Sequence, residues 1–268
     1  MAIYISTNLY EPQQLQNIFA LLKKMSLPIG IELFPEWQSE IFCKMLNMYY
    51  DEFKKHPITL HGPYYGTEHS RAEGTEEYAR AMVYFKKTFE LSRELKARHI
   101  VYHHNNCRID IGQKQELITV SEKNLAKLRR EAVKFKAKIV VENAGILAHK
   151  NMLFDQDEFI EMAERVPEKI LLDIGHAHAN GWNIKYIIER LADKIIAYHV
   201  HNNDGYEDKH DRIFHGTLDF ADFINCYKKY TPNADIVVEY GKQCAMDSEG
   251  IAEDIDYIKK NITAAASK

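Results

Sequence analysis

The 268-residue sequence has few cysteines, and none of them lies in a pattern that binds metal. Its four cysteines, at positions 43, 107, 226 and 244, lie far apart, and no two of them have a CxxC spacing. This distribution argues against a thiolate zinc site and against a disulfide framework, and it is typical of a reducing compartment. We therefore expect a cytoplasmic protein.

Long apolar runs and an excess of positive charge are also missing. No apolar run approaches the roughly 20 residues that cross a bilayer, and the first residues, MAIYISTNLY, indicate a β-strand instead of a targeting segment. The formal net charge of −4 gives no general attraction for nucleic-acid phosphates. The mildly basic stretch 123–138 is expected to be a solvated helix face. The sequence thus disfavours a membrane or a nucleic acid as partner, although DNA stays open.

Short β-branched runs alternate with amphipathic segments along the chain. The composition, 46% hydrophobic and 28% charged, is that of an ordinary globular protein. Segments such as EEYARAMVYFKKTFELSRELKA carry apolar residues at three- and four-residue spacing, which is typical of helices that pack on a sheet. The eight runs expected to form strands are residues 3–7, 29–33, 58–62, 99–104, 138–143, 169–175, 195–201 and 235–241.

This alternation predicts an α/β fold, a (β/α)8 TIM barrel that forms a single domain over residues 1–268. Eight repeats give about 33 residues each, the size of one βα unit. An open doubly wound sheet would alternate too, but TNLYEPQ follows the first strand where a GxGxxG turn is expected. The longer loops 63–75 and 202–218 follow strands, at the face where barrels hold their sites.

Six successive predicted strands end in a side chain that can bind a metal ion. They are His61, His103, Glu142, Asp173, His201 and Glu239. One such residue alone is more often hydrogen-bonded in the core or at the surface than a ligand, but in a barrel all six converge on one cavity. Buried carboxylates repel one another and lose hydration, and a cation relieves both effects. Nitrogen and oxygen donors without thiolate suit Zn²⁺, Mn²⁺, Co²⁺ or Fe²⁺. We therefore expect a divalent-metal site.

Two segments are denser in such residues. LLDIGHAHANG places Asp173 and His176 three residues apart, and HVHNNDGYEDKH holds two histidines followed by Asp204, Asp208 and His210. Because side chains alternate along a strand, His199 and His201 point the same way. We assign His201, at the strand mouth, as the ligand and expect His199 to lie deeper, supporting the ligands or packing. His104 and His178 are expected outside the ligand set, and His215 is left open.

The segments LHGPYYG, VYHHNN, VVENAG, LLDIGHAHANG, HVHNNDGYEDKH and VVEYG together resemble those of the xylose-isomerase-like TIM barrels. This superfamily joins sugar isomerases and epimerases with endonuclease IV, and the resemblance runs from the third strand to the eighth. For the isomerases and epimerases it implies one metal ion, held here by Glu142, Asp173, His201 and Glu239. It also implies that Glu142 and Glu239 exchange a proton with carbon beside a carbonyl while the metal stabilises the enediolate.

The resemblance to endonuclease IV extends to nine ligands for three zinc ions. The first ion would be held by His61, His103 and Glu142, the second by Glu142, Asp173, His201 and Glu239, and the third by His176, Asp208 and His210. Three departures oppose this reading. NNDGYEDKH lacks an arginine before the Asp, HHNN replaces His-Pro-Gly, and FPEWQSE is acidic where DNA binding needs basic or aromatic residues.

The leading hypothesis is a metal-dependent isomerase or epimerase that acts on a sugar, sugar phosphate or related polyol. Glu142 and Glu239 are its acid/base pair, His176 and Tyr64 bind substrate, and one to three ions of Zn, Mn, Co or Fe are the cofactor. The alternative is an apurinic/apyrimidinic endonuclease, with Tyr64 and Tyr65 as stacking residues. A third class is a metal- or sugar-binding barrel without catalysis. Arg212 is expected to be a surface loop residue, and a homo-oligomer stays open.

Overall fold

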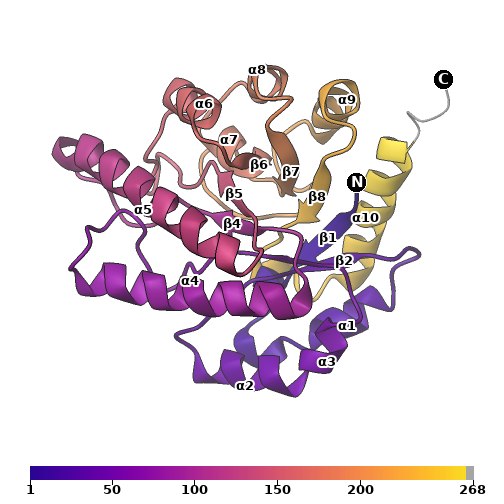
Figure 1. Ribbon diagram of the computed structural model, residues 1–268. Helices are drawn as coiled ribbons and strands as arrows, with labels where there is room; N and C mark the ends of the chain where they lie inside the picture. Colours follow the sequence, from indigo (N-terminus) through magenta and orange to yellow (C-terminus); the bar gives the residue numbers. More distant parts are fainter. Residues whose placement is uncertain (264–268) are drawn as a thin grey trace.

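Eight parallel strands close into a barrel in the order of the sequence, with helices around it (Figure 1). The computed structural model describes residues 1–263, and residues 264–268 of the predicted domain lie outside the described residues. The strands are β1 (Ile3–Ser6), β2 (Gly30–Leu33), β3 (Ile58–Leu60), β4 (Ile100–Tyr102), β5 (Ile139–Glu142), β6 (Lys169–Asp173), β7 (Ile195–Val200) and β8 (Asp235–Val238). The predicted (β/α)8 fold is confirmed.

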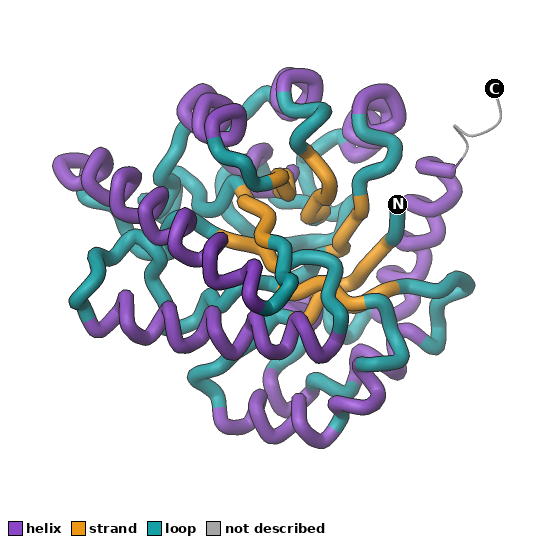
Figure 2. The backbone as a smooth tube through the Cα atoms, viewed as in Figure 1, coloured by secondary structure: helices purple, strands orange, loops and turns teal. Residues whose placement is uncertain are grey.

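The helices lie between the strands along the chain and surround them in space, as Figure 2 shows. The α-helices are α1 (Asn17–Leu22), α2 (Glu40–Met48), α3 (Tyr50–Phe53), α4 (Glu76–Leu95), α5 (Lys114–Lys134), α6 (Gln156–Arg165), α7 (Ile174–Ala179), α8 (Ile184–Arg190), α9 (Phe220–Tyr230) and α10 (Ser248–Thr263). Short 3-10 turns are η1 (Thr7–Leu9), η2 (Pro12–Gln14), η3 (Ile111–Gln113) and η4 (Lys242–Cys244). Among residues 1–263, no helix combines the length and the apolar character that crossing a membrane requires.

Helix α4 shows how the local sequence sets the element boundaries. Thr75 accepts a hydrogen bond from the Tyr78 backbone N–H, which satisfies one of the free donors of the first turn. Lys96, with φ of 54°, ends the helix in the left-handed conformation. The helix thus occupies the segment that the apolar spacing predicted, and α5 covers most of the basic stretch 123–138.

The strands are apolar on both faces because they pack against the helices outside and against each other inside. Most buried hydrophobic side chains form one core between the sheet and the helices. Inside the barrel, a small separate cluster of Val101, Val140, Leu171 and Ala197 fills the space. In β5, Glu142 follows Val140 at two-residue spacing and so points inward as well. This apolar layer lies directly below the polar side chains at the strand ends.

The strands end earlier than the sequence suggested. Strand β6 stops at Asp173 instead of Gly175, because the Asp173 carboxylate accepts a hydrogen bond from the His176 backbone N–H and thereby caps α7. Strand β7 stops at Val200, and Asn202 forms an antiparallel bridge with Asp211 within the following loop. Both early ends lie where metal-binding side chains are concentrated.

A buried carboxylate lies at the opposite end of the barrel. Asp235, at the start of β8, forms an ion pair with Arg98 Nε at 2.7 Å and accepts a hydrogen bond from the Ala2 backbone N–H at 2.7 Å. The neighbouring His99 is 1% exposed, and neither of its ring nitrogens has a hydrogen-bond partner among the described residues. Burial, helped by the charges of His199, Arg98 and Lys138, lowers the pKa of His99 from 6.5 to about 3.

We predict that His99 makes the fold sensitive to acid. Below pH 6.5 the unfolded chain protonates this residue, whereas the folded protein resists protonation until about pH 3. Stability is therefore fully present above pH 6.5 and falls as the pH drops, by at most about 1.4 kcal/mol per pH unit for one histidine. Urea unfolding between pH 7.5 and 4.5 should give a flatter pH profile for His99→Leu. The exposed His215→Gln control should keep the original slope, and an unchanged slope in His99→Leu would contradict the prediction.

Candidate metal centre

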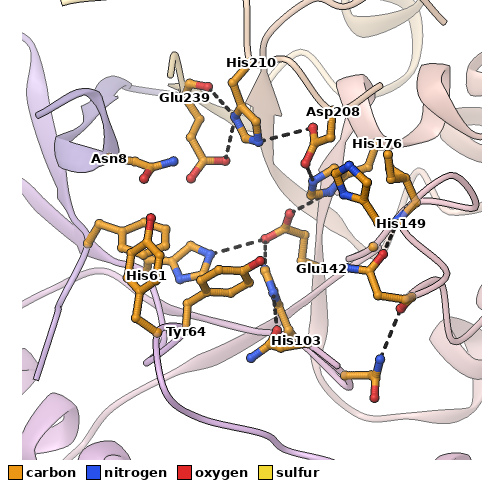
Figure 3. A pocket seen from close by; sticks show the side chains of 17 residues that line it. Asn8, His61, Tyr64, His103, Glu142, His149, His176, Asp208, His210 and Glu239 are labelled. Carbon is orange, nitrogen blue, oxygen red and sulfur yellow. Dashed lines mark hydrogen bonds and ion pairs between the residues drawn. The ribbon is translucent and has the colours of Figure 1, made fainter. Parts of the chain in front are cut away.

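The strand ends and the loops after them enclose a polar cavity of about 220 Å³. Figure 3 shows Glu142 at its centre, with His61 and His103 on one side and His176 on the other. Its lining residues are Asn8, Phe34, His61, Tyr64, Tyr65, His103, Asn105, Asn106, Glu142, Gly145, Ile146, His149, Asn151, His176, Asp208, His210 and Glu239. The structure thus brings together side chains that lie far apart in the sequence.

The carboxylates of Glu142, Asp173 and Glu239 surround the ring of His199. Its Nδ1 lies 3.4 Å from Glu142 Oε2, 3.1 Å from Glu239 Oε2 and 3.8 Å from Asp173 Oδ2. All four side chains are at most 3% exposed. We call Glu142, Asp173, His199 and Glu239 the inner cluster.

His201, the histidine expected as the ligand, lies beside this cluster, with its Nε2 3.1 Å from Asp173 Oδ1, and its role as a ligand stays a prediction. In the pairing of β6 with β7, Asp173 lies opposite His199, which brings the His199 ring among the carboxylates. A register irregularity between Ile170 and Leu171 of β6 contributes to this alignment. The expectation that His199 lies deep is met, since it is fully buried, but it lies among the carboxylates and contacts them directly.

His201 lies instead in a second group, which we call the loop cluster, together with His176, Asp208 and His210. Its ring stacks on that of His210, with centroids 3.8 Å apart and planes at 15°, and its Nε2 lies 3.1 Å from Asp173 Oδ1. Asp208 joins the other members, with 3.2 Å to His176 Nε2 and 3.2 Å to His210 Nε2. The loop cluster borders the inner cluster through Asp173.

A third group, the β3–β5 cluster, consists of His61, His103 and Glu142. His103 Nε2 lies 2.9 Å and His61 Nε2 lies 3.8 Å from Glu142 Oε2. The other nitrogen of each ring is held from outside the cluster, since His61 Nδ1 lies 2.8 Å from Gly62 O and His103 Nδ1 lies 3.0 Å from Asn106 Oδ1. Both Nε2 atoms therefore face the same carboxylate oxygen, which Glu142 shares with the inner cluster.

Several buried atoms of these clusters lack a hydrogen-bond partner and are suited to coordinate a cation. Glu142 Oε1, His176 Nδ1, His199 Nδ1 and Asp208 Oδ1 are buried and have no hydrogen-bond partner among the described residues. His176 Nδ1 and Glu142 Oε1 lie only 3.2 Å apart, yet without hydrogen-bond geometry. Buried polar atoms without partners are costly, and an ion coordinated between them removes this cost. Imidazole nitrogens and carboxylate oxygens are donors that suit Zn²⁺, Mn²⁺, Co²⁺ or Fe²⁺.

The surroundings of the two glutamates of the inner cluster shift their pKa values in opposite directions. Burial opposes the ionisation of Glu142, but the charges of His103 and His199, the hydrogen bond from His103 and the closeness of His176 outweigh it and hold the pKa of Glu142 well below its usual range. Burial raises the pKa of Glu239 to about 7, although His199 and His210 partly offset the effect. Two carboxyl groups whose environments separate their pKa values in this way are suited to opposite roles in proton transfer.

Several residues around the cavity were missing from the sequence prediction. Phe34 stacks on His61 with ring centroids 4.1 Å apart, and Asn8, Asn106 and His149 add polar groups to the wall. Glu32 of β2 contacts His199. Alternation in the segment IGIEL could have indicated that Glu32 points inward, because the buried Ile31 and Leu33 face the helices. The loop residues carried no such signal.

Other residues singled out in the sequence lie outside the cavity lining. His104 bonds to Ser121 Oγ and His178 to Thr217 Oγ1. The expectation that Arg212 is a surface residue differs from the structure, since its side chain is only 12% exposed and its guanidinium donates to Asp254 and Asp247 near the start of α10. Tyr64 and Tyr65 both line the cavity wall.

Comparison with known proteins identifies the family. The model for the xylose isomerase-like TIM barrel matches residues 15–261. The chain belongs to this family. Among curated relatives, the uncharacterized protein MJ1614 of Methanocaldococcus jannaschii is 29% identical over 147 residues, which are 54% of this chain and 56% of that protein. The match thus spans little more than half of that relative's length.

Solved structures with a similar fold match nearly the whole chain. A D-tagatose 3-epimerase-like protein superposes with a TM-score of 0.77 and 19% identity, covering 98% of this chain and 100% of the other. The IolI protein with a bound zinc atom gives a TM-score of 0.78 and 16% identity, with full coverage of both chains. At these identities the likeness concerns the fold.

We predict that Gly175 is required for the position of His201. A Cβ atom at residue 175 of α7 would overlap the His201 ring. Gly175→Ala should therefore lower the free energy of unfolding by about 1–3 kcal/mol, measured by urea denaturation. Gly112→Ala is the matched control, because a Cβ there meets only Asp110 Oδ1, at 3.8 Å. Equal stability of the two variants would show that the His201 ring is free to move.

Proposed function

We propose that this protein is a divalent-metal-dependent isomerase or epimerase that acts on a carbohydrate by proton transfer at carbon. The observation that carries the proposal is the arrangement of Glu142 and Glu239. One carboxylate comes from β5 and the other from the residue after β8, both line the cavity, and both approach Nδ1 of His199. Two carboxylates that face one bound substrate can remove a proton and return it.

The metal would be held by Glu142, Asp173 and Glu239 together with His201, whose Nε2 lies 3.1 Å from Asp173 Oδ1. The buried, unpartnered carboxylate oxygen Glu142 Oε1 supports a cation at this place. A divalent ion supplies stabilisation of the negative charge that develops on a substrate oxygen when a neighbouring carbon loses its proton. The zinc atom in the structure of IolI, a protein with a similar fold, supports a metal in this chain.

The chain's own residues supply the remaining steps. Glu142, which is held ionised, would take the proton from the carbon beside the carbonyl, and Glu239 would deliver a proton to that carbon or its neighbour. Tyr64 and His176 lie at the wall, where they can bind substrate hydroxyl groups. Tyr64 and Phe34 together cover His61, which limits the access of water from that side.

The charge of the cavity favours a carbohydrate without phosphate. Its described lining residues include no lysine or arginine. Nearby cations are already paired, with Lys209 2.6 Å from Asp204 and Lys242 2.9 Å from Glu11. Asn8, Asn105 and Asn106 offer both donors and acceptors, as the hydroxyl groups of a neutral sugar require. We therefore place an uncharged sugar or polyol before a sugar phosphate.

We expect the protein to catalyse exchange of a carbon-bound proton of a ketose with solvent deuterium. Glu142→Gln and Glu239→Gln should each lower the exchange rate by about 100-fold or more, because an amide cannot carry the proton. NMR of a panel of unphosphorylated ketopentoses and ketohexoses in D2O measures the exchange. Metal content must be determined for each variant, since both residues also belong to the inner cluster.

Glu131→Gln, at the surface of α5 and paired with Lys134, is the matched control and should leave the exchange rate unchanged. Exchange that persists in both cluster variants would refute the assignment of the acid/base pair. Absence of exchange with every carbohydrate in the panel would remove the support for the reaction class.

The second candidate function is cleavage of a phosphodiester bond at an abasic site. The observation in its favour is that the β3–β5 cluster and the loop cluster flank the inner cluster, so that three groups of metal-binding side chains lie together. Against it stands the absence of lysine and arginine from the cavity lining described above. DNA binding depends on such side chains to contact phosphates.

Metal content separates the two functions. We expect one tightly bound, exchangeable ion per chain by elemental analysis of the purified protein, and no specific nicking of a duplex with an abasic site. Three zinc ions per chain together with nicking that Glu142→Gln abolishes would overturn the isomerase proposal in favour of the endonuclease.

A further inference from the structure

Helices α4 and α5 cover neighbouring parts of the barrel (Figure 1), and a groove of about 630 Å³ lies between them. None of its lining residues belongs to the lining of the cavity at the strand ends. The groove is therefore separate from the candidate metal centre. Its lining residues are Tyr78, Met82, Lys86, Phe89, Lys127, Leu128, Arg130, Glu131, Lys134 and Phe135.

The base of this groove is apolar and aromatic. Phe89 and Leu128 are each 1% exposed, and the Phe135 ring stacks on that of Phe89, with centroids 5.8 Å apart and planes at 29°. The lining residues of α4 extend over positions 78–89, which corresponds to about 16 Å or three helical turns. The groove is therefore long enough for about three turns of a further helix.

Cationic side chains surround the apolar base. Lys86 of α4 and Arg130 of α5 are exposed, and neither has an ion pair or a hydrogen bond with another described residue. The Arg93 guanidinium lies 5.4 Å from the centre of the Phe135 ring and adds a third cation. Because the whole chain has a formal net charge of −4, this positive charge is a local feature of the groove.

Two further lysines of the groove already have partners within the chain. Lys127 lies 2.6 Å from Glu73, and Lys134 lies 2.7 Å from Glu131. The three other cations remain available to a binding partner. A partner that fits the groove must therefore combine an apolar surface with a small number of negative charges beside it.

We infer that this groove is a docking site for an acidic amphipathic helix of another protein. The apolar face of such a helix would fill the space above the two phenylalanine rings, and acidic residues beside that face would pair with Lys86 and Arg130. Val83 of α4 and Val133 of α5 are 54% and 72% exposed and offer further apolar contact. The inference goes beyond the proposed function and does not depend on it.

A nucleic acid fits the groove less well than an acidic helix does. Single strands bind by stacking their bases on exposed aromatic rings, but Phe89 is only 1% exposed. Glu131 lies in the groove and would repel phosphate groups, and two of the lysines there are already paired with carboxylates. The few remaining cations match the few carboxylates on one side of a helix.

Binding of a defined peptide tests the inference. The probe is a fluorescent synthetic peptide of about four helical turns, with leucine at three- and four-residue spacing and glutamate at the other positions. We expect the protein to bind it with a Kd of about 1–100 µM, measured by fluorescence anisotropy. A peptide with lysine in place of each glutamate should bind at least about 10-fold more weakly, because its charges repel those of the groove.

Variants of the protein locate the binding site. Lys86→Glu combined with Arg130→Glu should weaken binding of the acidic peptide by about 10-fold or more, because like charges then face each other. Met82→Gln should weaken it by about 3- to 10-fold, because the contact loses apolar surface. The matched control combines Lys44→Glu with Lys185→Glu, which changes the net charge equally at exposed positions of α2 and α8. It should change the affinity by less than about 2-fold.

Absence of peptide binding up to about 1 mM, or an equal loss in the two charge-reversal variants, would overturn the inference. Tighter binding of a single-stranded RNA that Lys86→Glu with Arg130→Glu abolishes would overturn it in favour of a nucleic acid. Self-association that the same variant abolishes, measured by sedimentation velocity, would overturn it in favour of a second copy of this chain. Circular dichroism of each variant checks that the fold is kept.

Discussion

Ionisable side chains are crowded together in a buried layer, and this crowding is the constraint on which the rest of the structure depends. The carboxylates of Glu142, Asp173 and Glu239 all lie within 4 Å of one imidazole nitrogen, and none is more than 3% exposed. Removing such charges from water is tolerable only when opposite charges or a cation compensate for the lost hydration. Histidines from β3, β4, β7 and the following loops supply part of that compensation.

The barrel allows this crowding because its closed, parallel sheet directs every strand end to the same rim. Below the rim, Val101, Val140, Leu171 and Ala197 exclude water from the interior. Around it, local features set the position of single side chains. The Asp173 carboxylate, for example, both caps α7 and contacts His201, so the start of that helix and the metal centre share one residue. The same carboxylate therefore stabilises the fold and belongs to the candidate metal site.

The sequence was sufficient for the fold and for most of the centre. Periodicity located all eight strands, because apolar residues on both faces of a parallel sheet make continuous runs. The position of His199 among the carboxylates needed the register of β6 against β7, including its irregularity near Ile170, which a single sequence does not encode in any readable pattern. Alternation in β2 could have indicated that Glu32 points inward, but its contact with His199, 167 residues away, could not be read from the sequence. The loop residues that line the cavity could not be predicted either, because their positions depend on the path of the loop backbone.

The clamp between Arg212 and Asp254 gives the last helix a part in the centre. Arg212 lies two residues after His210, and its guanidinium is bound by Asp247, Asp254 and the Gly250 carbonyl at the beginning of α10. The loop that carries Asp208 and His210 is thus tied down by chain that follows it by some forty residues. During synthesis this loop leaves the ribosome before its anchor exists. The loop cluster is therefore held in its final position only after α10 has packed against the barrel, so its geometry depends on a helix that contributes no side chain to it.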